Sequence, residues 1–118
     1  MVNSRPSRSR RVPNFSLADI QAAARAKRIR FDYNAERKRR ALGIGIDEAI
    51  DCICVIKPSD FYKPVTLNDG TLADVYRPKL EYYCEVYDHY RNEVMYIKLN
   101  LTSDGTLVMS FKPKDNHD

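Results

Sequence analysis

Tyr96 and Lys112 are the residues of this chain whose types and positions first point to chemistry. In the segment 94–101 the odd positions hold methionine, isoleucine and leucine, and Tyr96 stands at an even position. In the segment 106–112 the odd positions are again apolar, and Lys112 is even. Because successive strand side chains point to opposite faces, both residues are predicted to lie on the face away from the core. A phenol beside an ammonium group is chemistry suited to a phosphate substrate.

A hairpin is predicted to bring these two strands together. Thr102-Ser103-Asp104-Gly105 is a strong turn signal between them. The two apolar sets share one face only if odd positions pair with odd positions, and a three-residue loop centred on Asp104 achieves this. The same register places Tyr96 directly opposite Lys112.

The strand before this hairpin is predicted over residues 82–90, with its turn at Arg91-Asn92. This register determines which side chains become neighbours on the open face: Glu85 with Lys98, and Tyr87 with Tyr96. A carboxylate opposite a lysine would hold the lysine charged and oriented.

Helices are predicted ahead of the strands. Ser16 is a good N-cap for a helix that extends to about Lys27, and residues 29–33 alternate as a short strand. Asn34 can cap a second, very basic helix that ends at Gly43.

A third helix is predicted over residues 46–54, where apolar residues follow the i, i+3, i+4, i+7 and i+8 spacing. Asp69-Gly70 then marks a turn, and residues 72–76 begin the strands. Helices first and strands afterwards indicate an α+β domain, with an antiparallel sheet and the helices packed on one of its faces.

Length and composition favour one cytoplasmic domain. The chain has 118 residues, enough for a core that needs no disulfide or metal to fold. Residues 1–11 are polar and basic and are predicted to be a disordered tail, whereas residues 12–114 form the domain. No apolar segment is long enough to span a membrane. Three cysteines, an odd number, and two histidines indicate a reducing compartment and argue against a zinc site.

Charge is distributed unevenly along the chain. Residues 1–40 contain 12 lysine or arginine residues and 3 acidic ones, whereas residues 41–118 contain 8 and 13, so the two parts carry +9 and −5. This asymmetry favours a polyanionic partner, either a nucleic acid or a strongly acidic protein. The basic segment is Arg37-Lys38-Arg39-Arg40. It can attract phosphates, receive an acidic segment of a partner protein, or simply form a solvated helix face.

Four segments, in this order, resemble the MqsR family of bacterial type II toxins, the motility quorum-sensing regulator. They are Ser59-Asp60-Phe61-Tyr62-Lys63, Asp74-Val75-Tyr76-Arg77-Pro78-Lys79-Leu80, Met95-Tyr96-Ile97-Lys98 and Met109-Ser110-Phe111-Lys112. The first two are the specific ones. The resemblance covers roughly residues 15–114.

The resemblance implies a RelE-like fold and a sequence-specific messenger RNA endonuclease that a cognate antitoxin holds inactive. In that family cleavage needs no metal or other cofactor, and its best known members cut within GCU sequences. The antitoxin is expected to bind zinc and to carry a helix-turn-helix, so that the toxin meets DNA only through it. The matching motifs imply that the catalytic residues are Lys63, Tyr96 and Lys112.

Two features depart from the family pattern. Ala73 occupies the position of a family glutamine just before Asp-Val-Tyr-Arg-Pro, so the role of that amide is absent or is taken over elsewhere. The segment from Leu80 to Met95 is also longer than in the best known members, which implies a longer strand pair or a protruding tip at residues 88–92.

Metal-free RNA cleavage uses the 2′-hydroxyl group as the nucleophile on the adjacent phosphate. We expect Lys63 and Lys112 to bracket that phosphate, with one of them in proton transfer, and Tyr96 to orient the 2′-hydroxyl or to donate a proton. Arg77 is expected to bind phosphate oxygens in a fork, and Lys98 is a secondary candidate. Three tyrosines are either stacking surfaces for unpaired bases or sheet and core residues: Tyr62, Tyr76 and Tyr87.

Other functions are compatible with the same residues. A non-catalytic RNA-binding or ribosome-binding module of the same fold would explain Ala73. A regulator whose basic helix binds DNA is less well supported, because residues 36–41 form a short and almost uniformly cationic stretch.

Overall fold

The computed structural model describes residues 12–84 and 88–113, the last three of them by backbone only. In this part of the chain the α-helices are α2 (Leu17–Arg25), α3 (Tyr33–Leu42) and α4 (Ile46–Cys54), and a 3-10 turn, η1, spans Pro58–Asp60. The strands are β1 (Ile29–Phe31), β2 (Phe61–Thr66), β3 (Leu72–Tyr76), β4 (Lys79–Cys84), β5 (His89–Leu101) and β6 (Leu107–Pro113). The predicted tail, residues 1–11, lies outside the described residues.

The strands form one mixed sheet in the order β1-β6-β5-β3-β2, and β4 pairs with the first half of β5. The α+β class is therefore confirmed, but the prediction of a purely antiparallel sheet is wrong because β1 runs parallel to β6. The two strands lie far apart in the sequence, so no hairpin fixes their relative direction. The remaining pairs are antiparallel.

The predicted β5–β6 hairpin is confirmed in register and in turn. Tyr96 pairs with Lys112, and Leu101 pairs with Leu107. The Thr102 backbone N–H donates to the Thr106 carbonyl at 2.9 Å, which leaves a three-residue loop. Gly105 closes it at φ +86°, a left-handed conformation that glycine adopts without steric cost.

The predicted turn at Arg91-Asn92 is wrong. The chain reverses between Cys84 and His89, which pair with each other, and Asp88 adopts the left-handed φ of +56° at this reversal. Residues 91–93 are strand, where the Tyr82 hydroxyl donates to Glu93 and Arg91 forms an ion pair with Glu93. The reversal therefore lies at Asp88, ahead of the predicted turn.

The predicted neighbours Glu85–Lys98 and Tyr87–Tyr96 are wrong for the same reason. Lys98 already has a strand on each side of it, since it pairs with Val75 of β3 and with Ser110 of β6. Strand β4 begins to pair further back along β5, where Lys79 lies opposite Val94. Glu85 and Tyr87 themselves lie outside the described residues.

The helices begin and end close to where the sequence predicts. The Ser16 hydroxyl accepts from the Asp19 backbone N–H, which confirms the cap of α2, but the helix ends at Arg25 because Lys27 has a φ of +62°. The predicted cap of α3 is wrong by two residues: Asp32, not Asn34, accepts from the backbone N–H of Ala35, at 2.7 Å.

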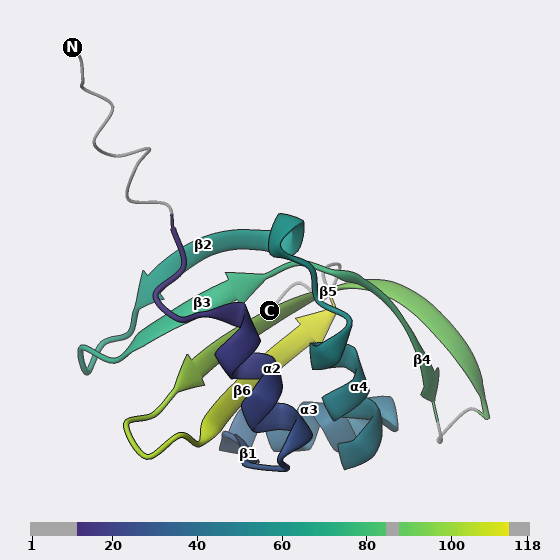
Figure 1. Cartoon of the computed structure of the whole chain (residues 1–118). Helices are drawn as coiled ribbons and strands as arrows, with labels where there is room; N and C mark the ends of the chain where they lie inside the picture. The colour runs from purple at the N-terminus through teal and green to yellow at the C-terminus, as the bar shows by residue number, and fades with distance from the viewer. Residues whose placement is uncertain (1–11, 85–87, 114–118) are drawn as a thin grey trace.

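The core lies between the helices and the odd-numbered side chains of β5 and β6. Met95, Ile97 and Leu99 are almost completely buried, as is Met109 opposite them. Helix side chains complete the cluster: Ile20, Ala24, Ala35, Ala49, Ile50 and Ile53. Figure 1 shows the sheet curving over α2 and α4, with α3 behind them beside β1. The even-numbered face of β5 is thereby left for the candidate site.

Candidate active site

Four strands place polar residues of the predicted site on one face of the sheet. Lys63 of β2 pairs with Val75 of β3, Val75 pairs with Lys98 of β5, and Lys98 pairs with Ser110 of β6. Directly paired residues project to the same face of a sheet. Lys63 and Lys98 therefore lie on the same face, two strands apart, and Tyr96 shares it with them.

A β-bulge in β2 brings a second side chain to this face. Phe61 pairs with Tyr76, whereas Lys63 pairs with the adjacent residue Val75, so β2 contains one extra residue between these pairs. A bulge of this kind redirects side chains locally. As a result Tyr62 reaches across to Tyr96, with 5.9 Å between the centroids of their rings.

Arg77 lies between these two tyrosines. Its guanidinium carbon is 3.9 Å from the centroid of the Tyr62 ring and 5.8 Å from that of Tyr96, and one N–H donates to the Tyr96 hydroxyl at 3.4 Å. The Nζ atom of Lys63 is 5.4 Å from the Tyr62 ring. Stacking holds the guanidinium plane against an aromatic face and leaves its N–H edge available to a planar or tetrahedral anion. The structure thus brings Lys63, Arg77 and Tyr96 together.

Lys112 is placed by its backbone. It pairs with Tyr96 across β5 and β6, so its Cα lies on the strand next to the arginine–tyrosine cluster. The sequence-based register is therefore confirmed at the position that matters most for the site.

The stacking role considered for Tyr76 is wrong. Only 1% of Tyr76 is exposed, and it pairs with the core residue Ile97 on the face that the helices cover. Burial raises the pKa of its phenol to about 12, as does the nearby carboxylate of Asp74. Ala73, at the position of the family glutamine, is also almost fully buried. Tyr87 lies outside the described residues.

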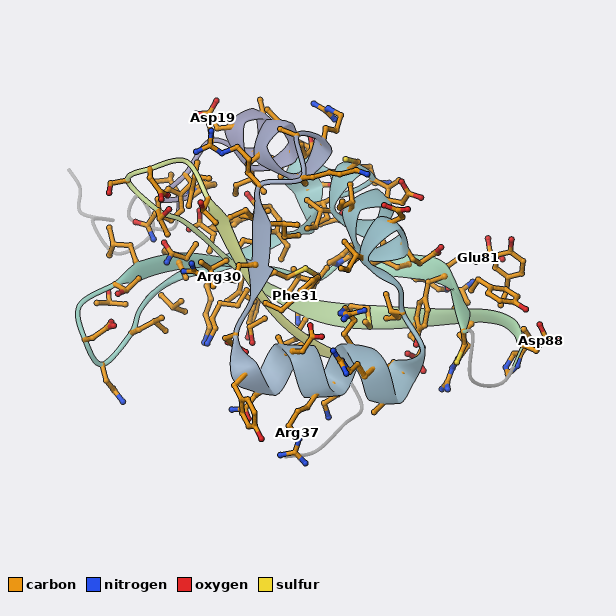
Figure 2. The ribbon with its side chains drawn as sticks, turned by 90° about the horizontal axis from the view of Figure 1, so that it is seen from below. Asp19, Arg30, Phe31, Arg37, Glu81 and Asp88 are labelled. Carbon is orange, nitrogen blue, oxygen red and sulfur yellow. The ribbon has the colours of Figure 1, made fainter. Side chains whose placement is uncertain are left out.

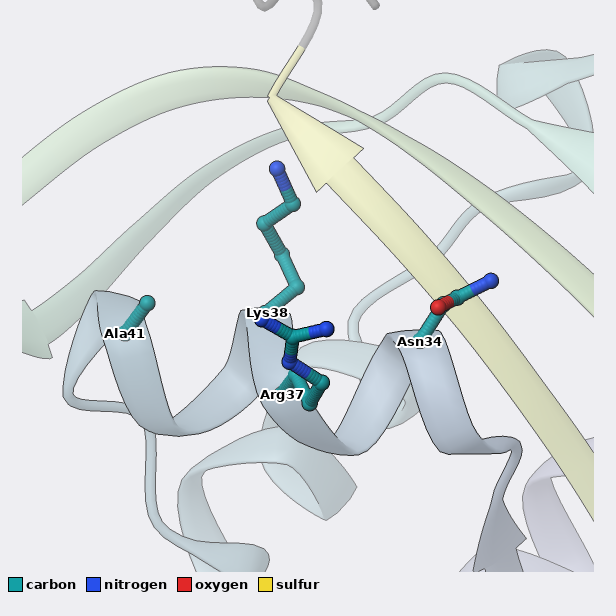
Figure 3. Close-up of a pocket in the computed structure, with 4 residues that line it drawn as sticks. All are labelled: Asn34, Arg37, Lys38 and Ala41. Carbon is teal, nitrogen blue, oxygen red and sulfur yellow. The ribbon is translucent and has the colours of Figure 1, made fainter.

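Helix α3 borders the site with a stripe of residues at helical spacing. Asn34, Arg37, Lys38 and Ala41 line a groove of about 410 Å³. Figure 3 shows the Lys38 side chain extending from α3 towards the C-terminal end of β6, the end that carries Lys112. Arg37 points away from the body of the protein in Figure 2. Both cations line this groove, although their side chains point in different directions.

The next two arginines bond to the helix itself. The Arg39 guanidinium donates to both carboxylate oxygens of Glu36 and to the Ile44 carbonyl, and it lies 5.2 Å from the Phe31 ring. Only 11% of its side chain is exposed. Arg40 also bonds to Glu36 but is 75% exposed. Arg39 therefore stabilises α3. Within the stretch predicted to bind phosphates, Arg37 and Lys38 are the two residues that line the groove.

Glu36 should titrate at unusually low pH. Hydrogen bonds from Arg39 and then Arg40 lower the pKa of its carboxyl group from the ordinary value to about 2. A lowered pKa in the folded state means that the ion pairs stabilise the protein above the unfolded-state pKa and are lost as the pH falls towards 2. A carboxyl titration by NMR should show this, and Arg39→Gln should move the Glu36 midpoint upwards. Glu81, which is exposed on β4, is the control carboxyl group.

Comparison with known proteins identifies the family. Residues 12–113 match the family described as the motility quorum-sensing regulator, toxin of MqsA. The chain belongs to this MqsR family. It is also 30% identical over 107 residues to the mRNA interferase toxin MqsR of Escherichia coli (strain K12), an alignment that covers 89% of this chain and 98% of that protein.

The described residues of this MqsR-family chain outside the site offer few further groups for metal binding or catalysis. Across residues 12–84 and 88–110, no three histidine, cysteine, aspartate or glutamate side chains gather into a metal-binding group. None of the helices in the described part is long and apolar enough to cross a membrane. His89 is exposed at the start of β5, seven residues or about 23 Å along the strand from Tyr96.

Three polar residues near the site are not among the predicted site residues, although strand alternation places two of them, Asn100 and Ser110, on its face. Asp32, Asn100 and Ser110 line a small cavity beside Lys98. The alternation of β5 predicted an outward Asn100, but neither alternation nor the family motifs placed Asp32 there. Only the return of the chain from β1 into α3 brings Asp32 to this face.

Proposed function

We propose that this protein is the toxin of a toxin–antitoxin pair and that it cleaves messenger RNA without a metal ion. The observation that carries the proposal is the cluster of Lys63, Tyr62, Arg77 and Tyr96 on one sheet face, with Lys112 in register beside it. Family membership supports the toxin role, and the E. coli relative is named an mRNA interferase.

The reaction is an internal transfer at phosphorus. The 2′-oxygen of one nucleotide attacks the adjacent phosphorus, the P–O5′ bond breaks, and the products are a 2′,3′-cyclic phosphate and a free 5′-hydroxyl. One proton leaves the 2′-hydroxyl and one is supplied to the leaving oxygen. Tyr96 orients the 2′-hydroxyl or supplies a proton, and one of Lys63 and Lys112 takes part in the proton transfer. Arg77 holds the non-bridging oxygens as they gain charge.

The RNA strand extends from this site along α3. Arg37 and Lys38 attract phosphates beyond the cleaved bond, Arg40 adds charge, and Lys98 contacts the nucleotide next to the site. Each neutralised phosphate of a single strand contributes a slope of about −0.7 to the logarithm of the binding constant against the logarithm of salt concentration. Removing both Arg37 and Lys38 should therefore make the slope shallower by about 1.4, whatever the RNA sequence.

The finer family properties belong to the same proposal. We infer a RelE-like fold, cleavage at GCU-type sites and action in the cytoplasm. The regulating partner is a cognate antitoxin that binds zinc and contacts DNA through a helix-turn-helix. The groove on α3 is also a surface where an acidic segment of that antitoxin can displace the RNA.

The decisive experiment is incubation of purified protein with a defined RNA in EDTA. Fragments that end in 2′,3′-cyclic phosphate are the expected products. The matched substrate has a 2′-O-methyl group at the cleaved nucleotide and should remain intact, because the nucleophile is blocked. Binding without cleavage would contradict the nuclease and favour the non-catalytic RNA-binding or ribosome-binding alternative.

The toxin role is tested separately in cells. Induction of the protein should arrest growth, and the product of the neighbouring gene should relieve the arrest when it is produced together with the protein. Growth that continues at a normal rate, with the protein shown to be soluble and abundant, would contradict the toxin role.

A further inference from the structure

A small cavity lies directly beside the proposed cleavage site. It has a volume of about 70 Å³ and opens between β3, β5, β6 and the start of α3. Lys98 and Asn100, which line it, follow Tyr96 on β5 at steps of two residues, or about 7 Å each. The cavity therefore begins one side chain away from the phenol, a separation that suits the nucleotide next to the one being cleaved.

The cavity combines an apolar lining with several polar groups. Leu67, Ala73, Val108 and Met109 supply the apolar surface, whereas Asp32, Lys98, Asn100 and Ser110 supply a carboxylate, an ammonium, an amide and a hydroxyl group. Within residues 12–84 and 88–110, the side chains of Lys98, Asn100 and Ser110 have no hydrogen-bond partner in the protein. Convergent polar groups around a small concave surface are typical of a ligand site.

The polar groups favour a nucleobase over a second phosphate. The Asp32 carboxylate would repel a phosphate, and it accepts one hydrogen bond, from the Ala35 N–H, which leaves its other oxygen as an acceptor. Amide, hydroxyl and carboxylate side chains are the groups that bind base edges, and unpaired RNA bases expose these edges. The volume corresponds to roughly two water molecules, which is room for the edge of one base and not for a whole base.

We propose that this cavity binds the base next to the cleaved bond and contributes to the sequence preference of the enzyme. This inference rests on the proposed function, because the base is positioned by the same RNA strand. Asp32 accepts from an exocyclic amino group, and Asn100 bonds to the remainder of the edge. Uracil has no amino group, so it is the base that this cavity should bind least well.

Cleavage rates on matched RNAs test the assignment. The substrates are short RNAs with one cleavage site and each of the four bases, in turn, on either side of the cleaved bond. Asp32→Asn keeps a residue that caps α3 well but replaces the carboxylate, Asn100→Ala removes the amide, and Asn92→Ala is the control at the exposed end of β5. Thermal unfolding verifies that each variant is folded.

For wild-type protein and Asn92→Ala we expect uracil to be disfavoured at one of the two positions. Asp32→Asn and Asn100→Ala should reduce that discrimination by roughly 10- to 100-fold, because cleavage of the other three substrates should slow more than cleavage of the uracil substrate. Equal loss on all four substrates, or an unchanged preference, would overturn the assignment.

A binding measurement keeps this inference separate from the proposed function. The same four sequences, made with 2′-O-methyl groups, cannot be cleaved, and their affinities are measured by fluorescence anisotropy. If wild-type protein cleaves no RNA but its base preference in binding is lost in Asn100→Ala, the cavity assignment holds and the nuclease fails. If cleavage occurs and no variant alters base preference in either assay, the nuclease holds and the cavity assignment fails.

Discussion

Replacing Tyr96 with phenylalanine is expected to lower the rate of RNA cleavage by roughly 10²- to 10⁴-fold, the usual contribution of a positioned acid or base. The substitution removes only the phenolic oxygen, which accepts from Arg77 at 3.4 Å, and keeps the ring that contacts Tyr62. Lys112→Ala should cause a loss of similar size. The measurement is the single-turnover rate constant with saturating protein in EDTA, together with the thermal unfolding midpoint.

Matched variants separate chemistry from folding. Tyr90→Phe removes a phenolic oxygen from the exposed end of the same strand, and Lys79→Ala removes an exposed lysine from β4; both should cleave RNA at the wild-type rate. When two residues act in the same chemical step, removing both lowers the rate little more than removing one. The double variant of Tyr96 and Lys112 should therefore cleave RNA about as slowly as the less active of the two single variants. Full activity in both purified single variants would refute the assignment.

The β5–β6 hairpin shows how much of the site the sequence determines by itself. Alternation of apolar residues at odd positions and a turn ending in Gly105 are local signals, and they were sufficient to pair Tyr96 with Lys112. The apolar spacing of α4 was similarly sufficient, because a strong helical period needs no tertiary information. Both predictions rest on many residues that agree with one register.

The missed features depend on single residues or on distant contacts. The bulge beside Lys63 brings Tyr62 to the site, and its only local sign is Pro64, which cannot donate to a strand partner and is confined to edge strands such as β2. The β4–β5 turn depended on Asp88 adopting a left-handed conformation, which asparagine at position 92 could equally have adopted. The parallel pairing of β1 has no local sign at all.

A different kind of long-range contact anchors the N-terminal segment on the sheet. Asp74 of β3 is completely buried, and its carboxylate accepts from the backbone N–H groups of Asn14 at 2.8 Å and Phe15 at 2.9 Å. The Asn14 amide in turn donates to the Ala73 carbonyl at 3.0 Å. These bonds fix the chain just before Ser16 begins α2, so a single carboxylate connects the N-terminus to the strand beneath the site.

Asp74→Ala is therefore expected to lower the free energy of unfolding by about 2–6 kcal/mol, because each of two partly buried N–H groups left without an acceptor costs about 1–3 kcal/mol. Asp74→Asn should also destabilise the fold, because its amide NH₂ group would face one of the two backbone N–H donors, from Asn14 or Phe15, and could not accept from it. Urea unfolding measures both, with Asp51→Ala on the exposed side of α4 as the control that should change stability by less than about 0.5 kcal/mol.

The destabilised variants should still cleave RNA at low temperature, because Asp74 points to the face opposite Lys63 and Lys98. A loss of less than about 1 kcal/mol in Asp74→Ala would show that solvent replaces the carboxylate and that the N-terminal segment is not anchored by it.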